Sequence, residues 1–246
     1  MRLLLLAGIP EAARIAGALA REHRVAPIAS LPRAVRAPVP LGVPTRIGGW
    51  GGEDQFRDWL RRERVHAILD VTHPFDVRIS DRAFRAAADL GLDYLRFQRP
   101  PWTPGPDENW TFLNDCGEVA QKVPEGATLL LDTGGRGASE LGHLDHRTVH
   151  CRLDARLAPP VLPNGARWHY LDGRAPYDAE TEARLYDRLG IDWVVLLNTG
   201  GSEDRPKLEA ARRLGLGMGI VRRPPRPEAP RTETVSEVMR WVRRRL

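Results

Sequence analysis

Lysine is almost absent from this chain of 246 residues. Lys122 and Lys207 are its two lysines, so nearly all of the 37 basic residues are arginines. Such a bias is typical of a GC-rich genome. Arginine also binds carboxylates and phosphates through two parallel hydrogen bonds, a geometry that lysine lacks. With a formal net charge of +5, the composition leaves both interpretations open.

Cysteine is scarce as well, and no apolar run is long. The two cysteines, Cys116 and Cys151, have no metal-ligand spacing. This usage predicts a reduced, cytoplasmic protein. The opening run Leu3–Leu6 is too short for a signal peptide, and no stretch is long enough to span a bilayer. We therefore expect no membrane partner.

Several functional classes lack their motifs. The loose histidine cluster at positions 143, 146 and 150 has no further ligand to complete a metal site, so no metal is expected. The basic residues are not interleaved with aromatic residues, which argues against nucleic acid. No turn has the Walker spacing of an ATP-binding loop, and no Gly-x-Ser-x-Gly elbow is present. No tyrosine is followed four residues later by lysine, which argues against a short-chain-type carbonyl reductase.

What the chain does have is apolar runs that stop at a threonine beside glycine or histidine. They are Ala67–Val71, Thr128–Asp132 and Trp193–Leu197. Short continuous apolar runs are typical of strands buried on both faces of a parallel sheet. Residues that follow such strands lie at their carboxyl ends, where open α/β sheets bind ligands. The pattern indicates an enzyme that binds an anion or a nucleotide.

Strands and helices alternate along the sequence, which predicts βαβ units and mostly parallel sheets. The expected strands are Leu3–Leu6, Val25–Ala29, Ala67–Val71, Tyr94–Phe97, Thr128–Asp132, Thr148–Arg152, Trp193–Leu197 and Met218–Val221. The expected helices are Glu11–Ala20, Glu53–Arg62, Val77–Leu90, Asp178–Leu189, Asp204–Leu214 and Thr234–Arg245.

A proline-rich connector, Pro100–Pro106, separates two such patterns. We therefore predict an α/β protein of two Rossmann-like halves with a cleft between them. Residues 1–110 form the dinucleotide-binding half, and residues 111–246 form the second half.

The first strand leads into a shortened glycine motif, Gly8-Ile9-Pro10-Glu11. It resembles the opening of a dinucleotide fold, although a plain strand–helix turn explains it equally well. After the second strand stand Ser30, Arg33 and Arg36, and no acid is present. An acid there binds the ribose 2′-hydroxyl of NAD, whereas arginine accommodates the 2′-phosphate of NADP. The sequence favours NADP(H), with a solvated basic loop as the alternative.

Two further segments of the first half are candidates for ligand contact. The cluster Gly48–Gly52, which includes Gly49, permits close approach of a ligand or simply forms a mobile loop. Thr72 and His73 follow a buried strand, and His73 is a candidate to donate a hydrogen bond or to move a proton. A structural histidine is the alternative. Asp70 is expected to orient this loop, and Arg78 begins the next helix, where anions are attracted.

The second half offers hydroxyl and backbone donors at two matching turns. Thr133, Gly134 and Arg136 form the first turn, and Thr199 and Gly200 belong to the second. Lys207 lies in the helix that follows. It either reaches a carboxylate or lies on a solvated face.

Taken in order, these motifs resemble the precorrin-6A reductase family of cobalamin biosynthesis. The resemblance covers about residues 3 to 225. It rests on Asp70-Val71-Thr72-His73-Pro74-Phe75, Arg99-Pro100-Pro101-Trp102, Thr133-Gly134-Gly135-Arg136, Asn198-Thr199-Gly200-Gly201, Lys207-Leu208-Glu209-Ala210-Ala211 and Val221-Arg222-Arg223-Pro224. This chain departs from the family in two places: Ile9 stands where the family has threonine, and Leu197 stands where it has lysine.

The resemblance implies NADPH-dependent reduction of a double bond of precorrin-6A to give precorrin-6B. We expect cofactor contacts from Gly8, Ile9, Pro10, Glu11, Ser30, Arg33, Thr72, His73, Thr133 and Gly134. We expect substrate contacts from Gly49, Arg78, Arg99, Trp102, Arg136, Thr199, Gly200 and Lys207. The proton comes from His73 or from water, and neighbouring pathway enzymes are possible transient partners.

Two alternatives stay open on the sequence. One is a non-catalytic nucleotide- or tetrapyrrole-binding regulatory protein, suggested by the altered first turn. The other is the cobalt-precorrin-6A reductase of the anaerobic pathway.

Overall fold

The computed structural model describes the chain except for residues 32–39, 107, 142–143, 154–163 and 174, and the side chains of residues 135, 136 and 139. The chain divides into two compact units. Unit 1 comprises Met1–Pro100 together with Pro224–Leu246, and unit 2 comprises Pro101–Arg223. The expected division placed the end of the chain in the second half. The structure groups it with unit 1 because the last helix packs on the first sheet.

Unit 1 contains a six-stranded sheet in which every described pairing is parallel. Its strands are β1 (Arg2–Ala7), β2 (Ala26–Leu31), β3 (Thr45–Ile47), β4 (Ala67–Val71), β5 (Asp93–Phe97) and β12 (Arg231–Thr232). The order across the sheet is β12-β5-β4-β1-β2-β3. The winding reverses between β1 and β4, which makes their carboxyl ends the topological switch point, where doubly wound sheets bind ligands.

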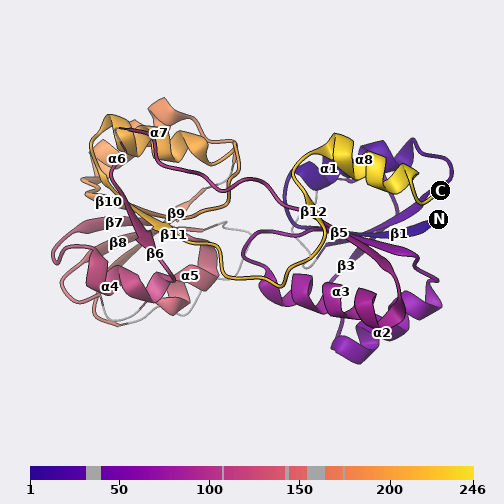
Figure 1. Ribbon diagram of the computed structural model, residues 1–246. Helices are drawn as coiled ribbons and strands as arrows, with labels where there is room; N and C mark the ends of the chain where they lie inside the picture. The colour runs from indigo at the N-terminus through magenta and orange to yellow at the C-terminus, as the bar shows by residue number, and fades with distance from the viewer. Residues whose placement is uncertain (32–39, 107, 142–143, 154–163, 174) are drawn as a thin grey trace. The chain divides into compact units, whose positions relative to one another are not determined.

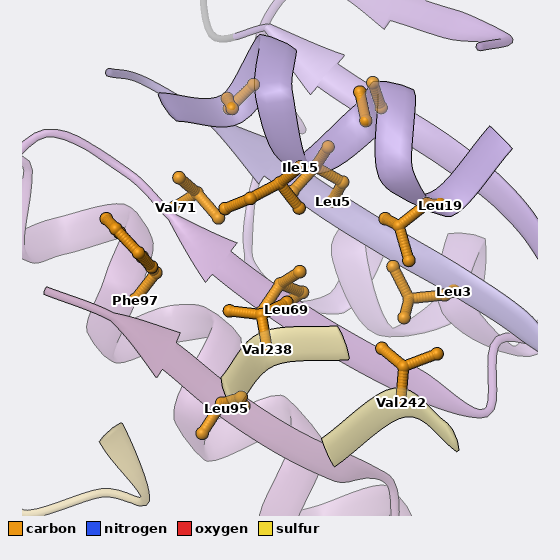
Figure 2. Close-up of a cluster of buried hydrophobic side chains, with 14 of the residues drawn as sticks. Leu3, Leu5, Ile15, Leu19, Leu69, Val71, Leu95, Phe97, Val238 and Val242 are labelled. Atoms are coloured by element: carbon orange, nitrogen blue, oxygen red, sulfur yellow. The ribbon is translucent and has the colours of Figure 1, made fainter. Parts of the chain in front are cut away.

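Helices cover both faces of this sheet (Figure 1). They are α1 (Glu11–Ala20), α2 (Glu53–Arg62), α3 (Val77–Leu90) and α8 (Val235–Arg243). Consecutive leucines of β1 point to opposite faces. Leu3 and Leu5 pack with α1 and α8 (Figure 2), whereas Leu4 and Leu6 pack with α2 and α3. Burial on both faces explains why β1 and β4 are continuous apolar runs in the sequence.

Unit 2 contains a second six-stranded parallel sheet. Its strands are β6 (Trp110–Leu113), β7 (Thr128–Asp132), β8 (Thr148–Leu153), β9 (Arg167–Asp172), β10 (Trp193–Leu197) and β11 (Gly217–Val221). Its helices are a 3₁₀ turn (Cys116–Glu118), α4 (Val119–Lys122), α5 (Gly134–Glu140), α6 (Ala179–Leu189) and α7 (Arg205–Arg213). Helices α6 and α7 lie on one face, and α4 and α5 on the other (Figure 1).

The two sheets have the same order, because β6-β11-β10-β7-β8-β9 in unit 2 matches β12-β5-β4-β1-β2-β3 in unit 1. In this correspondence β7 takes the place of β1, and β10 takes the place of β4. The sixth strand breaks the sequential pattern. Unit 1 takes β12 from the segment after unit 2, and unit 2 takes β6 from the segment before β7. The turns after β4 and β10 are therefore structurally equivalent.

The expected α/β architecture with parallel sheets is confirmed, and the bounds of α1, α2 and α3 are those that the sequence predicted. The strands that the sequence analysis missed, β3, β6, β9 and β12, occupy sheet edges. The Thr133–Gly137 segment was expected to be a turn and instead starts helix α5. Among the described residues, no helix combines the length and apolar character needed to cross a membrane.

Candidate functional site

A cavity of about 190 Å³ lies at the switch point of unit 1. The ends of β1, β2 and β4 line it, together with the glycine loop after β3 and the first turns of α3. The lining residues are Leu6, Ala7, Ser30, Gly48, Gly49, Trp50, Thr72, Asp76, Arg78, Ile79 and Arg82. The structure thus brings together four residues that the sequence singled out, namely Ser30, Gly49, Thr72 and Arg78.

Gly8 packs directly against the turn after β4. Its amide nitrogen donates to the oxygen of Val71 at 2.9 Å. A Cβ on Gly8 would lie 2.6 Å from the backbone nitrogen of His73 and 2.9 Å from Cα of Thr72. Only glycine fits this close approach of two backbones. The shortened glycine motif therefore has a structural reason, and it leaves an exposed backbone at the strand end.

The turn after β4 is organised by a buried carboxylate. Asp70 is fully buried, and its Oδ1 accepts a hydrogen bond from the amide of Thr72 at 3.0 Å. Its Oδ2 accepts from the hydroxyl of Tyr94 at 2.6 Å and from Ser80. Burial, followed by the negative charge of Asp70, raises the pKa of Tyr94. The expectation that Asp70 orients this loop is confirmed.

Thr72 and His73 present different groups from this turn. Oγ1 of Thr72 is buried and has no hydrogen-bond partner among the described residues, so the cavity contains a polar atom that a ligand can satisfy. The ring nitrogen Nδ1 of His73 accepts from the amide of Phe75 at 3.3 Å. An accepting Nδ1 places the proton of the neutral ring on Nε2. His73 can therefore donate from Nε2.

The end of β2 meets an arginine that the sequence analysis did not select. Arg46 on β3 donates from Nη1 to Oγ of Ser30 and to the oxygen of Gly48, both at 3.0 Å, and from Nη2 to the oxygen of Gly49 at 2.9 Å. Its guanidinium also lies 3.5 Å from the ring centroid of Trp50. Burial lowers its pKa. Register explains the oversight, because Ser30 pairs with Arg46 only once β2 and β3 align.

The remaining residues of the first turn have distinct environments. Ile9 is buried in the core with α1 and α8, so only its backbone remains for a ligand. Pro10 immediately precedes α1 and has no backbone N–H. Glu11 begins α1 and forms an ion pair with the buried Arg99, 2.7 Å apart. Arg99 was expected to bind substrate, and the structure places it against Glu11.

The switch point of unit 2 is occupied by buried charges. Lys207 is 3% exposed, and its Nζ lies 2.7 Å from both Asp132 and Asp204. Arg152 pairs with Asp132 at 3.0 Å and with Glu182 at 2.8 Å. Burial acts to lower the pKa of Lys207, but the two carboxylates outweigh it and raise the pKa. Lys207 thus reaches carboxylates of the protein itself and does not lie on a solvated face.

The turn after β10 is held by Trp102 of the proline-rich connector, through both its backbone and its indole. The backbone nitrogen of Trp102 donates to Oδ1 of Asn198 at 2.7 Å, and Nδ2 of Asn198 donates to the oxygen of Trp102 at 3.0 Å. The indole of Trp102 donates to the oxygen of Gly201 at 3.1 Å. Thr199 is buried, and Gly200 has a left-handed backbone with φ of 72°. Asn198 is a structural residue that its motif did not reveal.

The remaining expected site residues are Thr133, Gly134, Arg33 and Arg136. Thr133 is buried beside the exposed Gly134, which begins α5 with φ of 69°. Arg33 and the side chain of Arg136 lie outside the part that the structure describes. No group of three metal-binding side chains occurs within the described ranges.

Comparison with known proteins decides the family. Residues 2–243 match the family described as precorrin-6x reductase CbiJ/CobK. The chain belongs to this family. It is 36% identical to a precorrin-6A reductase of Rhodococcus erythropolis, covering 98% of this chain and 97% of the relative. It is 33% identical to a precorrin-6A reductase of Rhodobacter capsulatus, covering 98% and 95%.

A solved structure supports the same assignment. The structure titled CobK precorrin-6A reductase matches with a TM-score of 0.88 at 32% identity, covering 99% of this chain and 96% of that one. Membership makes this chain a reductase of the corrin-forming branch of metabolism. The family resemblance drawn from the sequence is therefore confirmed.

Proposed function

We propose that this reductase uses NADPH to reduce one double bond of precorrin-6A, giving precorrin-6B. The observation that carries the proposal is the cavity at the β1/β4 switch point, which contains the unpartnered Oγ1 of Thr72. Its position is the one at which doubly wound sheets hold a nucleotide. Family membership supplies the reaction class.

The adenosine half of the cofactor fits the cavity. Leu6, Ile79 and Trp50 offer apolar surface, and Ser30 stands at the end of β2. In the sequence, no acidic residue occurs from Ser30 to Gly52 that could bind a ribose 2′-hydroxyl at that strand end. Arg46 on the neighbouring strand instead brings positive charge to Ser30. A 2′-phosphate is favoured by this arrangement, and a free diol is not.

The diphosphate belongs at the exposed backbone of Gly8 and the N-terminus of α1, where backbone N–H groups and the helix dipole favour anions. Glu11 stands at this terminus and would repel a phosphate. Arg99 lies 2.7 Å from its carboxylate and offsets that charge. In this proposal Arg99 supports the cofactor site through Glu11.

The cofactor supplies a hydride, and the protein orients the reactants and handles the proton. In this proposal His73 first binds a solvent proton at Nδ1, which ends the contact with the Phe75 amide. It then delivers the proton on Nε2 to the anionic macrocycle, and the ring returns to its neutral form. Thr72 contributes its hydroxyl to the same site. Arg78, which is exposed at the start of α3, is available for an acetate or propionate of the substrate.

The comparisons favour the cobalt-free substrate. Relatives named precorrin-6A reductase match nearly the whole chain at 31–36% identity. Relatives named cobalt-precorrin-6A reductase match about three quarters of it at 24–30%.

The direct test is the loss of NADPH absorbance on mixing with precorrin-6A, with NADH as the comparison. We expect turnover with NADPH and, by calorimetry, at least tenfold weaker binding of NADH, equivalent to about 1.4 kcal/mol. Arg46→Gln should narrow this preference, whereas Arg85→Gln, which removes an exposed ion pair with Glu53 in the same unit, should not. Equal affinity for NADPH and NADH in the wild type would contradict the proposal.

A further inference from the structure

The turn that carries His73 is held by an arginine from near the end of the chain. Arg226 donates from Nη2 to the backbone oxygen of His73 at 2.7 Å and from Nη1 to Oγ of Ser80 at 3.2 Å. Ser80 in turn donates to the buried carboxylate of Asp70. One guanidinium therefore joins the backbone of the turn to the carboxylate cluster beneath it.

Arg226 is itself held in place. Arg96 donates from Nη1 to the oxygen of Pro227 at 3.2 Å, and the amide of Arg96 donates to Pro230 at 2.8 Å. Strand β12, which follows, pairs with β5. Burial lowers the pKa of Arg226, because the charged guanidinium loses part of its hydration where it contacts the turn.

The same device occurs at the equivalent turn of unit 2. Arg223 donates from Nε to the oxygen of Asn198 and from Nη2 to the oxygen of Thr199, both at 2.9 Å. Arg223 and Arg226 flank Pro224-Pro225, whose rings fix the backbone angle φ. One short segment thus carries two arginines. Arg223 binds two backbone oxygens of the turn after β10, and Arg226 binds one backbone oxygen of the turn after β4.

We propose that Arg226 is a positioning residue of the reductase: it fixes the backbone at His73 and thereby the place of the imidazole. The inference rests on the proposed role of His73 in proton delivery. A planar guanidinium reaches His73 and Ser80 at once, whereas a lysine ammonium lacks this fork geometry. Loss of the bridge leaves the turn attached through Asp70, and the oxygen of His73 keeps only the hydrogen bond from the amide of Asp76 at 2.8 Å among those described. A displacement of about 1 Å at a reacting group can lower a rate by on the order of 100-fold.

The test is a cycle of four enzymes: wild type, Arg226→Gln, His73→Ala and the double variant. We expect Arg226→Gln to lower kcat about tenfold or more with a nearly unchanged KM for precorrin-6A, and Arg226→Lys to recover part of the loss. Because Arg226 acts through His73, the double variant should have the kcat of His73→Ala alone. Arg222→Gln is the matched control, since Arg222 is exposed and lies over Phe112.

The imidazole signals of His73 in NMR spectra give a readout that does not depend on turnover. They should shift in Arg226→Gln and in Arg226→Lys but not in Arg222→Gln. Additive effects of the two substitutions on kcat, or unmoved His73 signals, overturn the inference. If His73→Ala is impaired and Arg226→Gln is not, only the positioning role fails. If His73→Ala keeps full kcat, the proton-delivery role fails first and the positioning role with it.

Discussion

Gly8 and His73 lie backbone to backbone: a Cβ on Gly8 would be 2.6 Å from the nitrogen of His73. The backbone of Gly8 is not in the left-handed region, so glycine is required here for space alone. The contact joins the turn after β1 to the turn after β4. Any side chain at position 8 must separate the two turns that define the switch point of unit 1.

Gly8→Ala is therefore expected to destabilise unit 1 by about 1–3 kcal/mol, because the clash is with backbone and the strand end must shift. Cofactor binding should weaken as well. Urea unfolding and calorimetric titration with NADPH measure the two effects. Gly17→Ala is the matched control: Gly17 lies within α1 with only Arg21 at 4.0 Å, and alanine there should stabilise by about 0.5–1 kcal/mol. Equal effects at both positions would contradict this account.

Asp70→Ala should be more damaging. It removes the acceptor of Thr72, Ser80 and Tyr94 and leaves the buried Arg96, 3.5 Å away, without its counter-charge. Breaking a buried charge pair costs about 3–5 kcal/mol. Asp89→Ala removes an exposed pair with Arg57 and should leave the stability nearly unchanged. The free energies of unfolding of the two variants test this prediction. A small loss in Asp70→Ala would refute the conclusion that Asp70 organises the turn after β4.

Lys207→Met separates a structural from a substrate-binding lysine. The substitution removes the cation that Asp132 and Asp204 share. We therefore expect the free energy of unfolding to fall by about 3–5 kcal/mol. Lys122→Met, which breaks an exposed pair with Glu118, should leave the stability nearly unchanged. Because the pKa of Lys207 is raised, its contribution is present below the ordinary lysine pKa and is lost as the pH rises through the folded-state value. A stable Lys207→Met enzyme with a raised KM would instead assign the lysine to substrate.

The lowered pKa of His150 leads us to expect that the protein loses stability as the pH falls. Its ring stacks on His169 at 4.9 Å, and burial, followed by the charge of His169, lowers its pKa from 6.5. The unfolded chain then binds a proton that the folded chain refuses, so stability falls as the pH drops below about 6.5. His150→Gln should flatten this slope in urea unfolding between about pH 5 and pH 8, whereas the exposed His23→Gln should leave it unchanged. Parallel slopes for the wild type and His150→Gln would contradict the prediction.

The sequence predicted most of the central elements because their signals are local. Burial on both faces makes β1, β4, β7 and β10 continuous apolar runs, and the helices that follow strands have a clear amphipathic period. The edge strands were missed for the opposite reason. β9 has only half-buried and exposed residues, without regular alternation, and β3 is only three residues long. Neither has a pattern that separates it from a loop.

The residues of the candidate site also fall into two groups, those that the sequence could reveal and those that it could not. Thr72, Ser30 and Gly49 could be selected because they follow strands, and parallel strands end at one edge of a sheet. Arg46 and Arg226 could not be selected, because each acts on a residue brought near by pairing or by the return of the chain.

By itself the sequence determined which segments are buried strands, which turns stand at their carboxyl ends and which residue types those turns offer. These properties follow from neighbours along the chain. Only the tertiary structure decided that Glu11 faces Arg99, that Lys207 is enclosed by Asp132 and Asp204, and that a C-terminal arginine supports His73. Such pairings depend on strand order and register, which bring together charges far apart in sequence. Because an unpaired buried charge is costly, each buried group then needs its partner.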